Sequence, residues 1–191
     1  MKIASYGVAA LLMTSLLTVF SASAAQYQIG TQNFTVPDGF EVERVAETNQ
    51  AARPVSAGFD DQGRLYVTDS SGSNLPPAEQ LKNPTHRVVR LEDTDGDGKA
   101  DRSVLFAANL SFPTSIAPWK GGVVATAPPE VVYLKDTDGD GRADYREVLS
   151  SGFHLGVTDS NVNGLRWGLD NRLHAVNGGN DGIIKSSRRP G

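Results

Sequence analysis

The most constraining feature of this sequence is an acidic, glycine-rich segment that occurs twice at a regular interval. Residues 93–101 read DTDGDGKAD, and residues 136–144 read DTDGDGRAD, roughly 43 positions later, a period typical of four-stranded propeller blades. Runs of β-forming residues precede both copies, at 87–91 and 130–134. Each acidic segment is therefore predicted to join two strands of a hairpin.

A second kind of hairpin is predicted upstream of each acidic segment. Residues 56–68, 115–126 and 164–176 each hold two β-rich runs separated by Gly, Asn or Asp residues, and Gly and Asn tolerate the positive φ that tight turns require. Two successive hairpins make one antiparallel four-stranded blade. The sequence thus predicts an all-β fold of propeller blades, at about 54–106, 113–150 and 163–191.

The third predicted blade is incomplete. Ile183 and Ile184 are expected to begin its third strand, close to the last residue, Gly191. Propellers have four or more blades, so we interpret residues 25–191 as the N-terminal part of a longer propeller, in effect a fragment. No helical periodicity is found after the leader, and residues 70–84 are expected to form an irregular loop.

Residues 1–24 have the pattern of a signal peptide. Lys2 supplies a positive start, residues 8–20 are mostly apolar, and small residues occupy 21–24. The apolar run is shorter than the ~20 residues that a membrane-spanning helix requires. We predict cleavage after Ala24, a periplasmic or secreted protein, and no transmembrane span after cleavage.

Charge and cysteine content exclude several classes of function. The formal net charge is −4, and loss of Lys2 with the leader makes it one unit more negative. Nucleic-acid binding would favour a basic surface, so no nucleic-acid partner is expected. The sequence has no cysteine, which excludes a disulfide, a lipoprotein anchor and a c-type haem attachment.

The acidic segments have the residue types and spacing of calcium-binding loops. Calcium prefers six to eight oxygen ligands, and Asp at positions 1, 3 and 5 with Gly at position 6 supplies three carboxylates on a sharp turn. A carbonyl at position 7 and an Asp at position 9 add further oxygens. The predicted ligands are Asp93, Asp95, Asp97, the Lys99 carbonyl, Asp101, Asp136, Asp138, Asp140, the Arg142 carbonyl and Asp144, with Glu147 at position 12 of the second loop. The alternative is a pair of solvated acidic turns.

Longer connections are predicted at the opposite end of the blades, where binding residues usually lie on a rigid scaffold. His154 and Asp159 are candidates for catalysis, His154 because its pKa lies near neutrality. Three further residues of these loops are candidates for cofactor binding: Asn163, Asn177 and Asp181.

Two further histidines and the two tryptophans are expected to have structural roles and not to bind a ligand. His86 opens a predicted strand and is expected to be exposed, whereas His174 lies inside a strand and is expected to pack. Trp119 and Trp167 end equivalent strands of successive repeats. We expect both indoles to pack against the blades and not to stack on a ligand.

Several segments together resemble one bacterial family. They are residues 34–40, FTVPDGF; residues 63–69, GRLYVTD; residues 163–170, NGLRWGLD; and the two acidic loops. This combination is similar to the membrane-bound dehydrogenase family of planctomycete type, which is related to sorbosone and soluble glucose dehydrogenases. The resemblance covers nearly all of residues 25–191 but only the beginning of the family's domain.

The resemblance implies a six- or seven-bladed propeller whose relatives oxidise sugars or aldehydes with pyrroloquinoline quinone. Their catalytic histidine corresponds to about Ser160 here. We therefore expect a dehydrogenase-like N-terminal part that is inactive alone. The alternatives are a non-enzymatic, calcium-stabilised propeller that binds glycans or proteins, and a truncated product without its own activity.

Overall fold

The computed structural model describes residues 24–187, and the chain divides into two compact units, Met1–Glu43 and Arg44–Gly191. In the first unit, β1 (Ala24–Ile29) and β2 (Gln32–Pro37) form an antiparallel hairpin. Gly30 allows this tight turn with φ of 60°, and the Tyr27 hydroxyl donates a hydrogen bond to the Phe40 carbonyl. The expected leader lies outside the described residues, apart from Ala24.

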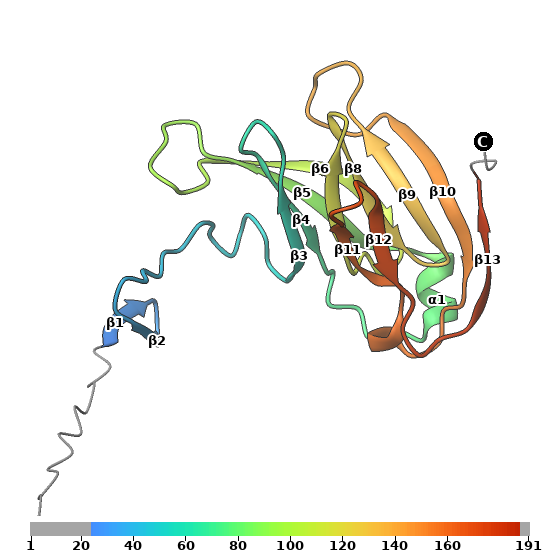
Figure 1. Cartoon of the computed structure of the whole chain (residues 1–191), viewed down its shortest axis with the longest axis horizontal. Coiled ribbons are helices and arrows are strands. Elements are labelled where there is room, and N and C mark those ends of the chain that lie inside the picture. The colour runs from blue at the N-terminus through green and yellow to red at the C-terminus, as the bar shows by residue number, and fades with distance from the viewer. Residues whose placement is uncertain (1–23, 188–191) are drawn as a thin grey trace, which may run out of the picture. The chain divides into compact units, whose positions relative to one another are not determined.

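The second unit contains two antiparallel sheets in which consecutive strands are neighbours (Figure 1). The strands of the first sheet are β3 (Pro54–Phe59), β4 (Leu65–Asp69), β5 (His86–Glu92) and β6 (Arg102–Leu110). Those of the second begin with β7 (Ile116–Trp119), β8 (Gly122–Ala127), β9 (Glu130–Lys135) and β10 (Tyr145–Phe153). The predicted all-β class and antiparallel pairing are confirmed.

The C-terminal strands differ from the expectation. β11 (Asn163–Trp167) and β12 (Leu173–Val176) form a two-stranded sheet. β13 (Gly182–Ser186) was expected to extend this sheet, but it pairs with β10 as a fifth strand of the second sheet. This pairing satisfies backbone groups of β10 that would otherwise form an open edge. A Cβ at Gly152 would lie only 2.0 Å from the Ile183 carbonyl oxygen, so the close approach requires glycine.

Two short helices occupy connections that were expected to be irregular. They are α1 (Pro77–Lys82), between β4 and β5, and the 3₁₀ helix η1 (Thr158–Ser160). Helices this short are too brief to produce a periodic hydrophobic pattern. Within residues 24–187, no helix is long and apolar enough to cross a membrane.

Apolar side chains fill the spaces between successive layers. One cluster joins Tyr66, Val88 and Phe106 of the first sheet to residues of the second sheet that include Val123 and Val132. A second cluster joins the opposite face of the second sheet to the segment that contains β11. A third lies on the outer face of the first sheet, against Ala46 and Ala51. Each sheet is therefore covered on both faces, as strands rich in consecutive Val, Leu and Ala require.

Phe106 anchors the cluster between the two large sheets. It is 1% exposed, and its ring packs edge-on against Tyr66 with a centroid separation of 4.9 Å. The neighbouring Leu105 is 37% exposed, because alternate residues of a strand point to opposite faces.

We predict that Phe106→Ala lowers the free energy of unfolding by about 3–5 kcal/mol, because it removes buried contacts and leaves a cavity. The matched change on the same strand, Leu105→Ala, is expected to cost less than about 1.5 kcal/mol, because much of that side chain is already hydrated. Urea unfolding monitored by circular dichroism measures both values. Equal losses would contradict the assignment of Phe106 to the core between the sheets.

Candidate functional site

The first acidic loop, between β5 and β6, is closed by its own carboxylates. Asp93 Oδ1 accepts the backbone N–H of Gly96 at 2.7 Å, and Oδ2 accepts that of Gly98 at 2.8 Å. Asp101 Oδ2 accepts both the N–H and the hydroxyl of Thr94 at 2.8 Å. The two glycines have φ of 82° and 87°, which lets the chain fold back around the first carboxylate.

The second loop, between β9 and β10, repeats this arrangement. Asp136 Oδ1 accepts the N–H of Gly139 at 2.7 Å, and Oδ2 accepts that of Gly141 at 2.8 Å. The carboxylate of Asp144 accepts the N–H and the hydroxyl of Thr137. Two loops far apart in the sequence thus have the same hydrogen bonds at equivalent positions.

Each loop brings carboxylate oxygens close together. In the first loop, Asp93, Asp95 and Asp101 each offer an oxygen within 4.8 Å of the others; in the second loop, Asp136, Asp138 and Asp140 do so. The structure thus gathers three of the predicted carboxylates in each loop.

Asp97 and Asp144 lie outside these groups of three. Asp97 Oδ1 accepts the N–H of Lys99, and its other oxygen lies 3.7 Å from the Lys99 ammonium. Asp140, which is in the second group, makes the matching contact with the N–H of Arg142. Glu147 lies on β10 opposite Tyr133 and outside both groups of three.

Hydrogen bonding lowers the pKa of four loop carboxylates, those of Asp93, Asp101, Asp136 and Asp144. Backbone N–H donors, Gly98 first, lower the pKa of Asp93, and those of Thr94 lower the pKa of Asp101. The Thr137 hydroxyl is the largest cause of the lowered pKa of Asp144. For Asp136, partial burial raises the pKa, but the N–H donors of its loop and the nearby Arg90 outweigh it, so the pKa is lowered.

Both loops also contact the part of the chain that precedes their sheet. The N–H of Ala100 donates to the Val45 carbonyl, in the segment before β3, and the equivalent N–H of Ala143 donates to the Phe106 carbonyl, on β6 of the first sheet, each at 2.8 Å. The alanine methyl groups join the adjoining apolar clusters. The second loop therefore helps to hold the second sheet against the first, and the first loop helps to hold the segment before β3 in place.

Arg90 adds a contact that the first loop lacks. This β5 residue is 6% exposed, pairs with Glu92 at 2.7 Å and places Nη1 3.8 Å from Asp136 Oδ2. The contact between Arg90 and the second loop was not predicted from the sequence, because only the stacking of the two sheets brings Arg90 close to Asp136.

The candidate residues at the opposite end do not form one site. Asp159 and Asn163 line a hollow of about 540 Å³ together with Arg166. Asn177 instead donates to the Asn180 carbonyl, and the Asp181 carbonyl accepts the N–H of His154. The His154 side chain is exposed.

Two expectations for histidines were wrong. His86 is 4% exposed, because α1 covers it and Gln80 Oε1 lies 2.9 Å from its Nε2. His174 is exposed, and its Nε2 lies 3.0 Å from Asp170 Oδ1. Its strand belongs to the two-stranded sheet, which provides no neighbouring strand to bury it. None of the three histidines lines the hollow that contains Asp159.

The two tryptophans also differ from each other. Trp119 packs against the cluster between the second sheet and β11, as expected. Trp167 is 48% exposed, so its expected packing is only partial. Both line a hollow near the β3–β4 and β7–β8 turns.

The described residues define an all-β repeat domain with two acidic loops that are closed by the same carboxylate–backbone hydrogen bonds. Residues 27–190 match a family described as Domain of unknown function (DUF7133), and the chain belongs to this family. Comparison with curated proteins and with solved structures gave no match.

Thr137→Val is expected to raise the pKa of Asp144 toward the ordinary value of about 3.9, because it removes the largest cause of the shift. A carboxyl whose pKa is lowered by folding stabilises the protein above its unfolded-state pKa, and this contribution is lost as the pH falls through the folded-state pKa. The acid-side loss of stability should therefore be shallower in the variant. Carbon-13 NMR titration of the carboxyl groups in EDTA measures the pKa.

Asp101 is the internal control for this change, because its partner Thr94 stays in place. Its pKa should not move in Thr137→Val. Equal shifts at Asp101 and Asp144 would show that the hydroxyl does not act locally.

Proposed function

We propose that this protein is an exported, calcium-binding repeat domain in which each acidic loop holds one Ca²⁺ ion. The observation that carries the proposal is the identical set of carboxylate hydrogen bonds in the two loops. Each loop keeps its chain folded around a group of carboxylate oxygens. The role of the ions is structural.

The donor set fits calcium. The groups contain carboxylate oxygens and no sulfur or imidazole ligand, and calcium prefers hard oxygen donors in a flexible geometry. Hydrogen bonds from backbone N–H groups leave other lone pairs of the same carboxylates available to a cation. The Lys99 and Arg142 carbonyls follow at position 7, where a backbone oxygen completes such loops. An ion would also relieve the repulsion between three neighbouring carboxylates.

We further propose that the layers are blades of a propeller. Two observations support this. Successive antiparallel sheets, in which consecutive strands β3 to β6 and β7 to β10 are neighbours, stack face to face through separate apolar clusters. The first strands of successive units, β3, β7 and β11, are also neighbours in space. In a propeller, the first strand of each blade lies nearest the axis, so contact between these strands is what the architecture requires.

Export and the relation to quinone-dependent dehydrogenases are carried by the sequence. The leader and the resemblance to the membrane-bound dehydrogenase family support an exported domain of that kind. No histidine lines the hollow around Asp159. The proposal therefore includes no dehydrogenase step and no bound pyrroloquinoline quinone for this chain alone.

Thermal unfolding in EDTA and across a calcium titration tests the proposal. A ligand that binds only the folded state stabilises it by RT ln(1 + [L]/Kd). With Kd of about 10⁻⁴ to 10⁻³ M, about 5 mM calcium should add about 1–2 kcal/mol per site and raise the midpoint by several degrees. Asp138→Asn/Asp140→Asn is expected to remove about half of this gain, because one loop remains intact.

The control is Asp159→Asn/Asp181→Asn, which makes the same change of charge at two exposed carboxylates outside the loops. It should retain the full calcium response. The proposal is contradicted if calcium does not raise the unfolding midpoint of the unsubstituted protein. It is also contradicted if the control variant loses as much of the calcium-dependent rise as the loop variant does.

A further inference from the structure

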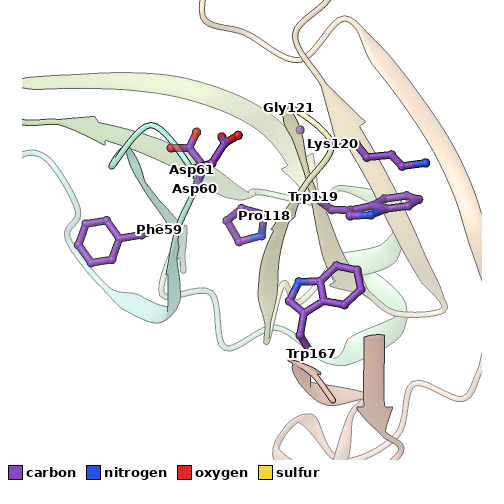
Figure 2. A pocket seen from close by; sticks show the side chains of 9 residues that line it. Phe59, Asp60, Asp61, Pro118, Trp119, Lys120, Gly121 and Trp167 are labelled. Carbon is purple, nitrogen blue, oxygen red and sulfur yellow. The ribbon is translucent and has the colours of Figure 1, made fainter. Parts of the chain in front are cut away.

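A hollow of about 280 Å³ lies among three turns or strand ends of different layers. Its wall contains the β3–β4 turn, the end of β7 with the following turn, and the end of β11. Figure 2 shows the lining side chains, among them Asp60, Asp61, Trp119, Lys120 and Trp167. Neither the acidic loops nor the hollow around Asp159 shares these residues.

The two indoles form an apolar corner of this hollow. Their ring centroids are 6.5 Å apart, and the ring planes meet at 48°. Trp119 is held in place by the edge of Tyr133, 5.4 Å away, and by the Lys120 ammonium, 4.7 Å from its ring centroid. Trp167 is 48% exposed. Its ring lies below Trp119 and Pro118 in Figure 2, where it provides an accessible flat apolar surface.

The polar groups beside the indoles are not equivalent. Both oxygens of Asp60 are in use: Oδ1 accepts the N–H groups of Gln62 and Arg64, and Oδ2 pairs with the Arg64 guanidinium at 2.7 Å. The carboxylate of the adjacent Asp61 is exposed and makes no hydrogen bond or ion pair within residues 24–187. The hollow is therefore lined by a free acceptor, the Asp61 carboxylate, and by Lys120, whose ammonium lies over the Trp119 ring.

We propose that this hollow binds a neutral saccharide. A pyranose ring has an apolar C–H face that packs against an indole, and hydroxyl groups around its rim that need both acceptors and donors. Trp167 provides the stacking surface, Asp61 accepts from the hydroxyls, and Lys120 donates to them.

The charges disfavour two other classes of ligand. A quaternary ammonium would compete with Lys120, which already occupies the cation position over Trp119. An anion would meet the unneutralised Asp61 carboxylate. A neutral ligand with many hydroxyls meets neither obstacle. The inference goes beyond the calcium-binding role and does not depend on it.

Intrinsic fluorescence is a direct test, because the chain has two tryptophans and both line the hollow. The purified protein is titrated with glucose, galactose, xylose and cellobiose, in EDTA and again in calcium. We expect a saturable change of emission with at least one of these sugars. Trp167→Ala is expected to weaken that binding by about tenfold or more, with Trp119 as the remaining reporter, and Asp61→Ala by about fivefold.

Leu169→Ala is the matched control. Leu169 is a fully exposed apolar residue two positions from Trp167 and does not line the hollow, so this variant should bind as the unsubstituted protein does. Far-UV circular dichroism compares the fold of every variant. Should Trp167→Ala fail to fold, Asp61→Ala alone decides, because it changes an exposed side chain without a partner.

The proposal is overturned if none of the four sugars changes the emission in a saturable way, or if Asp61→Ala binds as tightly as the unsubstituted protein. It is also overturned if choline or a short peptide saturates the signal and the sugars do not. Sugar binding in EDTA would support the saccharide site even if calcium does not stabilise the fold. The test of the saccharide site is therefore separate from the test of the calcium proposal.

Discussion

The acidic loops depend on one repeated interaction, the acceptance of two backbone N–H groups by the carboxylate of the first aspartate. Asp93 and Asp136 each draw two glycine amides of their own loop onto their oxygens. The loop thereby closes, and the N–H of Ala100 donates to the carbonyl of Val45 before β3, while that of Ala143 donates to the carbonyl of Phe106 in the first sheet. Local carboxylate chemistry is in this way connected to the stacking of layers. A cation bound to the same carboxylates would stabilise both at once.

The geometry of the sheets explains why the two ends of the strands differ. The short turns and acidic loops follow the regular repeat, so they place similar side chains at similar positions in successive layers. The connections at the opposite end differ in length and include α1 and η1, which lie at that end in Figure 1. The hollow between Trp119 and Trp167 belongs to the regular end. It exists only because three layers meet there, since no single repeat contains its full set of polar and aromatic groups.

Local sequence predicted what depends on local chemistry. The acidic hairpins and the order of strands β3 to β10 follow from turn residues and β-forming runs, and the structure confirms them. Features that depend on tertiary contacts were not predictable. Burial of His86 requires α1 to fold over it, and Arg90 reaches Asp136 only when two sheets stack. The pairing of β13 with β10 was missed because it depends on a close backbone approach between segments far apart in the sequence, which Gly152 and Gly182 allow.

A calcium titration followed by nitrogen-15 NMR tests the central claim most directly, because it observes each loop separately. The amides of Gly98 and Gly141 donate to the aspartates proposed as ligands, whereas that of Gly63 donates to a carbonyl in the β3–β4 turn. We predict saturable shifts of the Gly98 and Gly141 resonances and no comparable shift of the Gly63 resonance. Unchanged Gly98 and Gly141 resonances at several millimolar calcium would contradict the claim that these loops are calcium sites.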